Sequence, residues 1–121
     1  MRKLIVFLMV VLAVSLAACG GQATTGGGGG DAAAGKLVFN QGASPPCASC
    51  HSVEAGVTLV GPSLAGIASE FTTADAMRQA VVEPNAEIAE GFAANIMPTT
   101  YGSQLSDQQL SDLVAYLLTL K

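Results

Sequence analysis

Two cysteines and the only histidine of the chain stand together in the segment Cys47-Ala48-Ser49-Cys50-His51. Thiols at this spacing lie about one helical turn apart, with the imidazole directly beside the second. A zinc site normally needs four protein ligands, or three and an open position, and this domain offers only these three side chains. A thioredoxin-like redox pair would need a strand–helix context, which is not visible here. A Cys47–Cys50 disulfide would suit an exported domain, but it gives His51 no role.

The same C-x-x-C-H spacing is typical of the attachment site of c-type haem. Two thiols one turn apart reach the two vinyl groups on one edge of the porphyrin, and the adjacent histidine projects under the ring toward the iron. We therefore expect Cys47 and Cys50 to bind one haem c covalently and His51 to be an axial iron ligand. So short a domain with few aromatic residues would bury a thin core, which a large, flat, apolar cofactor would fill.

The second axial position needs another side chain, because the chain has a single histidine. Two of the four methionines fall in the N-terminal segment that we expect to be removed, which leaves Met77 and Met97; the few lysines are weaker candidates. Met77 falls inside a predicted helix, where a methionine more often fills the core. Met97 lies in a predicted loop that Pro98 stiffens, so its soft thioether is the predicted second ligand.

Residues 1–18 have the pattern of a bacterial export signal, with two basic residues before the apolar run Leu4–Val14. The segment Leu16–Cys19 (LAAC) resembles a bacterial lipobox, in which the cysteine is lipidated and becomes the first residue of the mature protein. The alternative is an ordinary signal cut that leaves Cys19 as a stray thiol with no visible partner. Lipidation of Cys19 would supply two acyl chains, enough for stable membrane anchoring.

Residues 19–34 predict a flexible tether, because they contain the run Gly26–Gly30 and no bulky apolar side chain. Residues 35–121 predict the globular domain. Without the export signal, three basic and nine acidic side chains remain, a net charge of −6. This charge argues against nucleic acid as a partner and favours proteins that present basic patches.

The domain is predicted to be all-α, with three to five short helices and long loops wrapped around one covalent haem. A first helix is expected over residues 35–39, with Gly35 and Phe39 on one face, and a second over residues 63–70. A third is expected from Thr72 or Thr73 and must end before Pro84, which lacks an N–H group.

The last helix has the clearest signal. Ser106–Gln109 has the pattern of a capping box, and Leu105 and Leu110 are spaced as a hydrophobic staple. The apolar stripe that follows at helical spacing consists of Leu110, Leu113, Val114, Leu117 and Leu118.

On these residues the domain resembles a class I cytochrome c over essentially all of residues 35–121. The matching positions are Gly35, Phe39, Cys47, Cys50, His51, Gly61, Pro62, Met97, Pro98 and Tyr116. The resemblance implies that the first and last helices cross where Gly35 approaches Tyr116. It also implies that the Pro62 carbonyl accepts a hydrogen bond from Nδ1 of His51 and so orients the ring.

The stretch from Glu83 to Gly91 is also similar to cytochrome domains that are fused to, or work with, terminal oxidases and bacterial photosynthetic chains. The basic surface around the haem edge of mitochondrial relatives has no counterpart in this acidic domain, so their partners do not carry over. Haem propionates need donors, and Arg78, Asn95, Tyr101 and Ser103 are candidates among which the sequence does not choose.

The expected function is that of a lipid-anchored electron carrier, not an enzyme, on the extracytoplasmic (periplasmic) face of a bacterial membrane. Its expected donor is a quinol-oxidising complex and its acceptor a terminal oxidase or a photosynthetic reaction centre, with no small-molecule substrate. The alternative is a haem peroxidase or gas-binding sensor with an open sixth coordination position. That alternative usually needs a distal acid–base group, and the single histidine is already used.

Overall fold

The computed structural model describes residues 29–121, so the predicted export signal, the predicted lipidation site Cys19 and most of the predicted tether lie outside the described residues. The described part is all-helical and contains no strand. Its elements are α2 (Ala32–Gln41), a 3-10 turn η1 (Cys47–Ser49), α3 (Ile67–Glu70), α4 (Ala74–Val82), α5 (Tyr101–Gln104) and α6 (Asp107–Leu117). Within residues 29–121, no helix is long and apolar enough to span a membrane.

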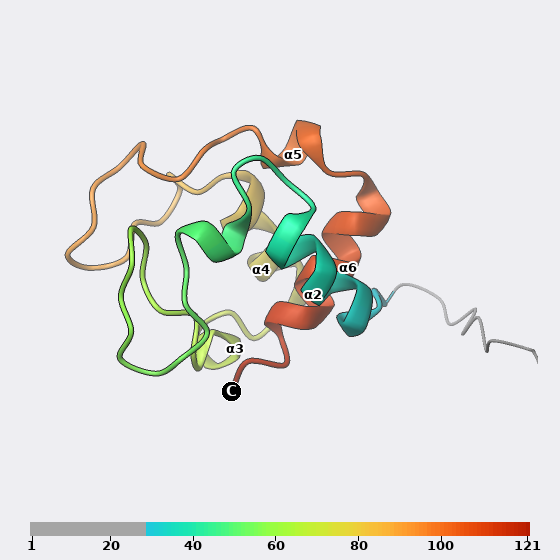
Figure 1. Cartoon of the computed structure of the whole chain (residues 1–121), viewed down its shortest axis with the longest axis horizontal. Coiled ribbons are helices and arrows are strands. Elements are labelled where there is room, and N and C mark those ends of the chain that lie inside the picture. The colour runs from blue at the N-terminus through green and yellow to red at the C-terminus, as the bar shows by residue number, and fades with distance from the viewer. Residues whose placement is uncertain (1–28) are drawn as a thin grey trace, which may run out of the picture.

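Helices α2 and α6 cross on the side of the domain where the described chain begins (Figure 1), and they make extensive contact. The crossing is close because Gly35 has no side chain: a Cβ atom there would collide with the carbonyl group of Asp112 and come within 2.8 Å of Cβ of Tyr116. One turn further along α2, the ring of Phe39 packs against that of Tyr116 with centroids 5.5 Å apart and a tilt of 58°. The predicted approach of Gly35 to Tyr116 is therefore present in the structure.

Helix α2 begins earlier than the sequence predicted. Ala32 to Ala34, assigned to the tether, form its first turn, and the side chain of Asp31 caps it by accepting from the N–H groups of Ala33 and Ala34. The N–H of Asp31 in turn donates to Oδ1 of Asp112 on α6, at 2.7 Å. The domain thus starts about four residues before Gly35, because α6 supplies a partner for the capping residue.

Helix α6 has the predicted N-terminus. Ser106 accepts from the N–H of Gln109, and the Gln109 side chain accepts from the N–H of Ser106, so both halves of the capping box are formed. Leu105 and Leu110 are both buried. The helix supplies much of a core made of Val38, Phe39, Ile67, Met77, Val81, Tyr101, Leu105, Leu110, Leu113, Val114, Tyr116 and Leu117.

The second and third predicted helices are α3 and α4. Thr73 caps α4, which ends at Val82 as the approaching Pro84 requires. The prediction for residues 63–70 was too long: α3 begins only at Ile67, because Gly66 has a φ angle of +83°, outside the helical region. The short α5 was not predicted, since four residues carry no recognisable periodicity.

Long loops form the other side of the molecule. In Figure 1 the segment between η1 and α3 and the segment between α4 and α5 lie together on the side away from the start of α2. These loops, with α4 and the inner faces of α2 and α6, enclose a cavity of about 520 Å³.

Candidate functional site

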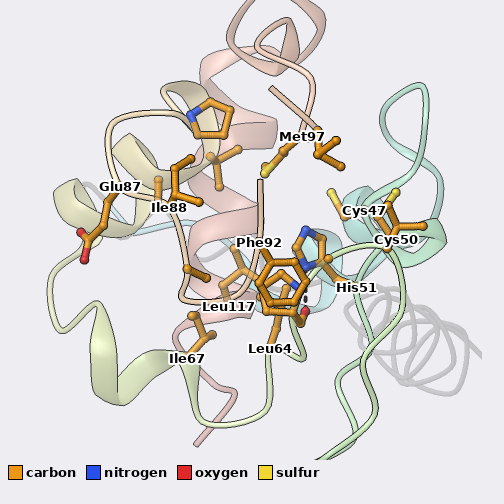
Figure 2. Close-up of a pocket in the computed structure, with 18 of the residues that line it drawn as sticks. Cys47, Cys50, His51, Leu64, Ile67, Glu87, Ile88, Phe92, Met97 and Leu117 are labelled. Carbon is orange, nitrogen blue, oxygen red and sulfur yellow. Dashed lines mark hydrogen bonds between the residues drawn. The ribbon is translucent and has the colours of Figure 1, made fainter. Parts of the chain in front are cut away.

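The cavity brings together the residues that the sequence analysis singled out. Cys47, Cys50, His51, Pro62 and Met97 all line its wall, although they come from three separate segments. Figure 2 shows His51 and Met97 reaching into it from different loops, with the two cysteines beside them. Its volume is in the usual range for a small-molecule site, about 300–1,000 Å³.

The rest of the wall is mainly apolar. It includes Phe39 of α2, Ile67 of α3, Met77 and Val81 of α4, and Leu113 and Leu117 of α6, together with the loop residues Leu64, Ile88 and Phe92. The charged side chains on the wall are those of Glu70, Glu87 and Glu90, all exposed. An apolar interior with its charges at the outside suits a large apolar ligand that leaves one edge near water.

The turn η1 brings Cys47, Cys50 and His51 together. The N–H groups of Cys50 and His51 both donate to the Cys47 carbonyl, at 3.1 and 2.9 Å. Both thiols are free and half-buried, so no disulfide joins them. Burial raises the pKa of the Cys47 thiol, which keeps it protonated near neutral pH.

The imidazole of His51 is held in one orientation. Its Nδ1 atom lies 2.9 Å from the carbonyl oxygen of Pro62, the contact that the resemblance implied. A carbonyl oxygen can only accept a hydrogen bond, so Nδ1 carries the proton and Nε2 of the neutral ring keeps its lone pair. This is the tautomer that an iron ligand needs.

Gly61 leaves room for the ring, a role that the sequence analysis did not recognise. A Cβ atom at this position would come within 2.6 Å of Cε1, 2.9 Å of Nδ1 and 3.1 Å of Nε2 of His51. The backbone of Gly61 is also fixed, since its N–H donates to the Cys50 carbonyl at 2.8 Å. The Gly61-Pro62 pair was visible in the sequence, but the contact between Gly61 and the ring needs the fold.

The two candidate methionines differ in their surroundings. Met77 is 2% exposed on α4 and belongs to the core, as the sequence predicted. Met97 is half-buried in the loop before α5 and carries its sulfur at the cavity wall (Figure 2). Both line the cavity, but Met97 is the one whose neighbours in the chain are not helical.

These residues fit a covalently attached haem. Two thiols one turn apart, an imidazole with an available Nε2, a thioether and an apolar wall all face one cavity. The donor set is that of a c-type haem centre with histidine and methionine ligands. Among residues 29–121, no group of three or more histidine, cysteine or acidic side chains is arranged to hold a metal ion directly.

The four candidate propionate donors all have partners within the protein. Arg78 forms an ion pair with Asp107 at 2.7 Å, and the Tyr101 hydroxyl donates to the Pro45 carbonyl. The Ser103 hydroxyl donates to the carbonyl of Thr100 in its own turn, and Asn95 pairs with Asn85. These bonds give each side chain a structural role.

Comparison with known proteins identifies the domain. The family model described as cytochrome c matches residues 32–121, about three-quarters of the chain. The match begins at the first residue of α2 and includes every element of the described structure. No curated protein sequence matches the chain.

Proposed function

This chain belongs to the cytochrome c family, and we propose that it is a membrane-anchored electron carrier whose haem iron is bound by His51 and Met97. Covalently bound haem c and transfer of electrons follow from the family. The axial ligands, the anchor and the partners are our proposals.

The arrangement that supports the proposed ligands is the placement of His51 and Met97 at one cavity, beside Cys47 and Cys50. When bound, haem supplies the Fe(II)/Fe(III) couple. Cys47 and Cys50 would hold the haem covalently through thioether bonds, and His51 would bind the iron through Nε2. The hydrogen bond from Nδ1 to Pro62 keeps the imidazole oriented and makes it a stronger ligand.

Met97 would supply the second protein ligand to the iron. A thioether ligand stabilises the reduced state and raises the reduction potential relative to a second nitrogen ligand. Bound to the iron, Met97 would also keep water and oxygen away from it. Because both ligands would stay bound in either oxidation state, electron transfer would need little rearrangement of the protein.

The alternative of a peroxidase or gas-binding sensor requires a vacant position where Met97 stands. The two functions therefore make opposite predictions about exogenous ligands. A carrier in which Met97 occupies the sixth position binds carbon monoxide slowly and weakly in the ferrous state, whereas a sensor or peroxidase binds it readily.

The proposed location is the extracytoplasmic face of a bacterial membrane, with lipidated Cys19 as the anchor. Attachment of haem c outside the cytoplasm agrees with the export signal. The described chain begins beside α6, where Asp31 bonds to Asp112, and the loops around the cavity lie on the far side (Figure 1). A tether that joins there would leave the cavity edge open to partners.

The proposed partners are other redox proteins. The net charge of −6 without the export signal favours partners with basic surfaces. We propose a quinol-oxidising complex as the donor and a terminal oxidase or photosynthetic reaction centre as the acceptor, with no small-molecule substrate and no nucleic acid.

The carrier function is tested on the full chain produced with a haem-maturation system. We expect pigment that stays with the protein in acidified acetone, and a ferrous spectrum that changes little under carbon monoxide. Release of the pigment would contradict covalent attachment, and rapid formation of a carbon monoxide complex would favour the sensor or peroxidase.

The anchor is tested separately, by growing cells with labelled palmitate. We expect the label in the wild-type chain and none in Cys19→Ala, which should also leave the membrane fraction. Label that persists in Cys19→Ala would overturn the lipid anchor without affecting the electron-carrier proposal.

A further inference from the structure

The segment after Met97 is joined to the segment before Cys47 by three hydrogen bonds. The hydroxyl of Tyr101 donates to the carbonyl of Pro45 at 3.0 Å. Oε1 of Gln104 accepts from the N–H of Ser44 at 2.9 Å, and its Nε2 donates to the Ser44 carbonyl at 3.1 Å. We call these three bonds the α5 latch.

The latch connects the two segments that carry the proposed attachments to the cofactor. Pro45 is two residues before Cys47, and Tyr101 is four residues after Met97. Tyr101, Cys47 and Met97 all line the cavity. No regular helix or strand joins these segments directly, so side-chain bonds to backbone groups hold them together.

The two side chains of the latch have different surroundings. Tyr101 is 3% exposed, and burial raises the pKa of its phenol, so the hydroxyl remains a donor. Gln104 is exposed, but it engages both backbone groups of Ser44 and also donates to the hydroxyl of Thr100 at 2.8 Å. Removing the Tyr101 hydroxyl leaves the Pro45 carbonyl without its partner, whereas water can replace Gln104.

We infer that Tyr101 and Gln104 are positioning residues for Met97: they hold its loop against the cysteine segment and so keep the thioether on the iron. The inference rests on the proposed ligation by His51 and Met97. The long loop between α4 and α5 has no helix of its own. With the latch broken, conformations in which Met97 has moved off the iron become more populated, although both helices of the crossing stay packed.

The test compares Tyr101→Phe, Gln104→Ala and the double variant with the wild-type chain, all carrying haem. Carbon monoxide binding to the ferrous protein reports how often the sixth position opens. We expect it to be roughly tenfold faster in the double variant, with smaller changes in each single variant, because a neutral hydrogen bond changes an equilibrium by a factor of a few.

A second measurement separates positioning from general stability. The near-infrared sulfur-to-iron band of the ferric protein is followed on heating, together with far-ultraviolet circular dichroism. We expect the double variant to lose the band at a lower temperature than its helical signal. Ser103→Ala is the matched control, since Ser103 lies on the same helix and bonds only to Thr100 in its own turn.

Two outcomes would overturn the inference. One is an unchanged carbon monoxide rate in both Tyr101→Phe and the double variant. The other is loss of the band and of helix at the same temperature, which would show that the latch only stabilises the fold. A wild-type chain that lacks the band would refute the proposed Met97 ligand itself. The spectrum of the wild-type chain therefore distinguishes failure of the Met97 proposal from failure of the latch inference.

Discussion

The crossing of α2 and α6 and the loop side of the cavity (residues 43–62 and 83–100) are built by different means. The crossing is a packed contact in which Gly35 lies against α6 and the rings of Phe39 and Tyr116 meet. The loop side contains one short 3-10 turn and depends on individual hydrogen bonds, such as that of Tyr101 with Pro45. The crossing thus provides a stable base, and the loops hold the chemical groups.

This difference predicts that variants at the crossing change the stability of the whole domain and leave the haem spectrum unchanged, whereas loop variants next to the proposed iron ligands change the spectrum as well.

The largest loss of stability is expected from Gly35→Ala. The new methyl group would collide with the backbone of Asp112, so the helices must separate, and overpacking of this kind costs about 3 kcal/mol. Chemical denaturation measures the change. Gly102→Ala is the control, because its methyl group would meet Val82 at an ordinary 3.4 Å. Equal stability of the two variants would contradict a close crossing at Gly35.

Gly61→Ala tests the loop side at the iron ligand. Its methyl group would come within 2.6 Å of the His51 ring, which must rotate and weaken its bond to Pro62. We expect a stability loss of about 2 kcal/mol and a ferric spectrum shifted toward high spin. Gly56→Ala is the control: it has a φ of +75° but open space around it, so it should lower stability by about 1 kcal/mol and leave the spectrum unchanged. A normal spectrum in Gly61→Ala would argue against His51 as ligand in this orientation.

Asp112→Ala removes the carboxylate that holds the start of α2. Asp112 is 8% exposed and accepts from the N–H of Asp31 and the amide of Gln108, at 2.7 and 2.8 Å. Loss of these bonds should cost about 1.5–2 kcal/mol and increase hydrogen exchange at the first turn of α2, with no change in the haem spectrum. Asp112→Asn keeps an oxygen acceptor and should be less affected. A spectral change as large as that of Gly61→Ala would mean that the two regions are not separate.

The smallest effect is expected from Asn85→Ala. Asn85 accepts from the N–H of Asn95 at 2.7 Å and donates to its side chain at 3.1 Å, which closes the loop before Met97. Both residues are exposed, so the loss should be about 1 kcal/mol, with a modest weakening of the near-infrared band. Asn40→Ala, which removes an exposed bond to Lys36 within α2, is the matched control and should leave the band intact.

The two regions also differ in how far the sequence predicts them. The start of α6 could be predicted because the capping box and the leucine spacing are local signals. The start of α2 was placed three residues late, because Asp31 directly follows the glycine run and shows no local helix signal. The group that holds its backbone N–H is the side chain of Asp112, which lies 81 residues away in the sequence. The prediction for α3 was too long because Gly66 adopts a positive φ, which stops the helix from starting earlier. The sequence does not reveal which glycines will adopt a positive φ.

For the site, the motif Cys47–His51 and the pair Gly61-Pro62 were recognisable, and these residues do meet at one cavity. The room that Gly61 leaves for the His51 ring and the α5 latch could not be predicted. Ser44 and Gln104 are 60 residues apart, and neither belongs to a pattern. Contacts of single side chains with distant backbone groups leave no periodic signal.

The central proposal, iron held between His51 and Met97, is tested most directly by the near-infrared band of the ferric protein. Outside the predicted export signal the chain has two methionines, so Met97→Leu and Met77→Leu form a matched pair. We predict that Met97→Leu loses the band and binds carbon monoxide readily in the ferrous state, whereas Met77→Leu keeps the band. A band that survives in Met97→Leu, or that disappears only in Met77→Leu, would contradict the account.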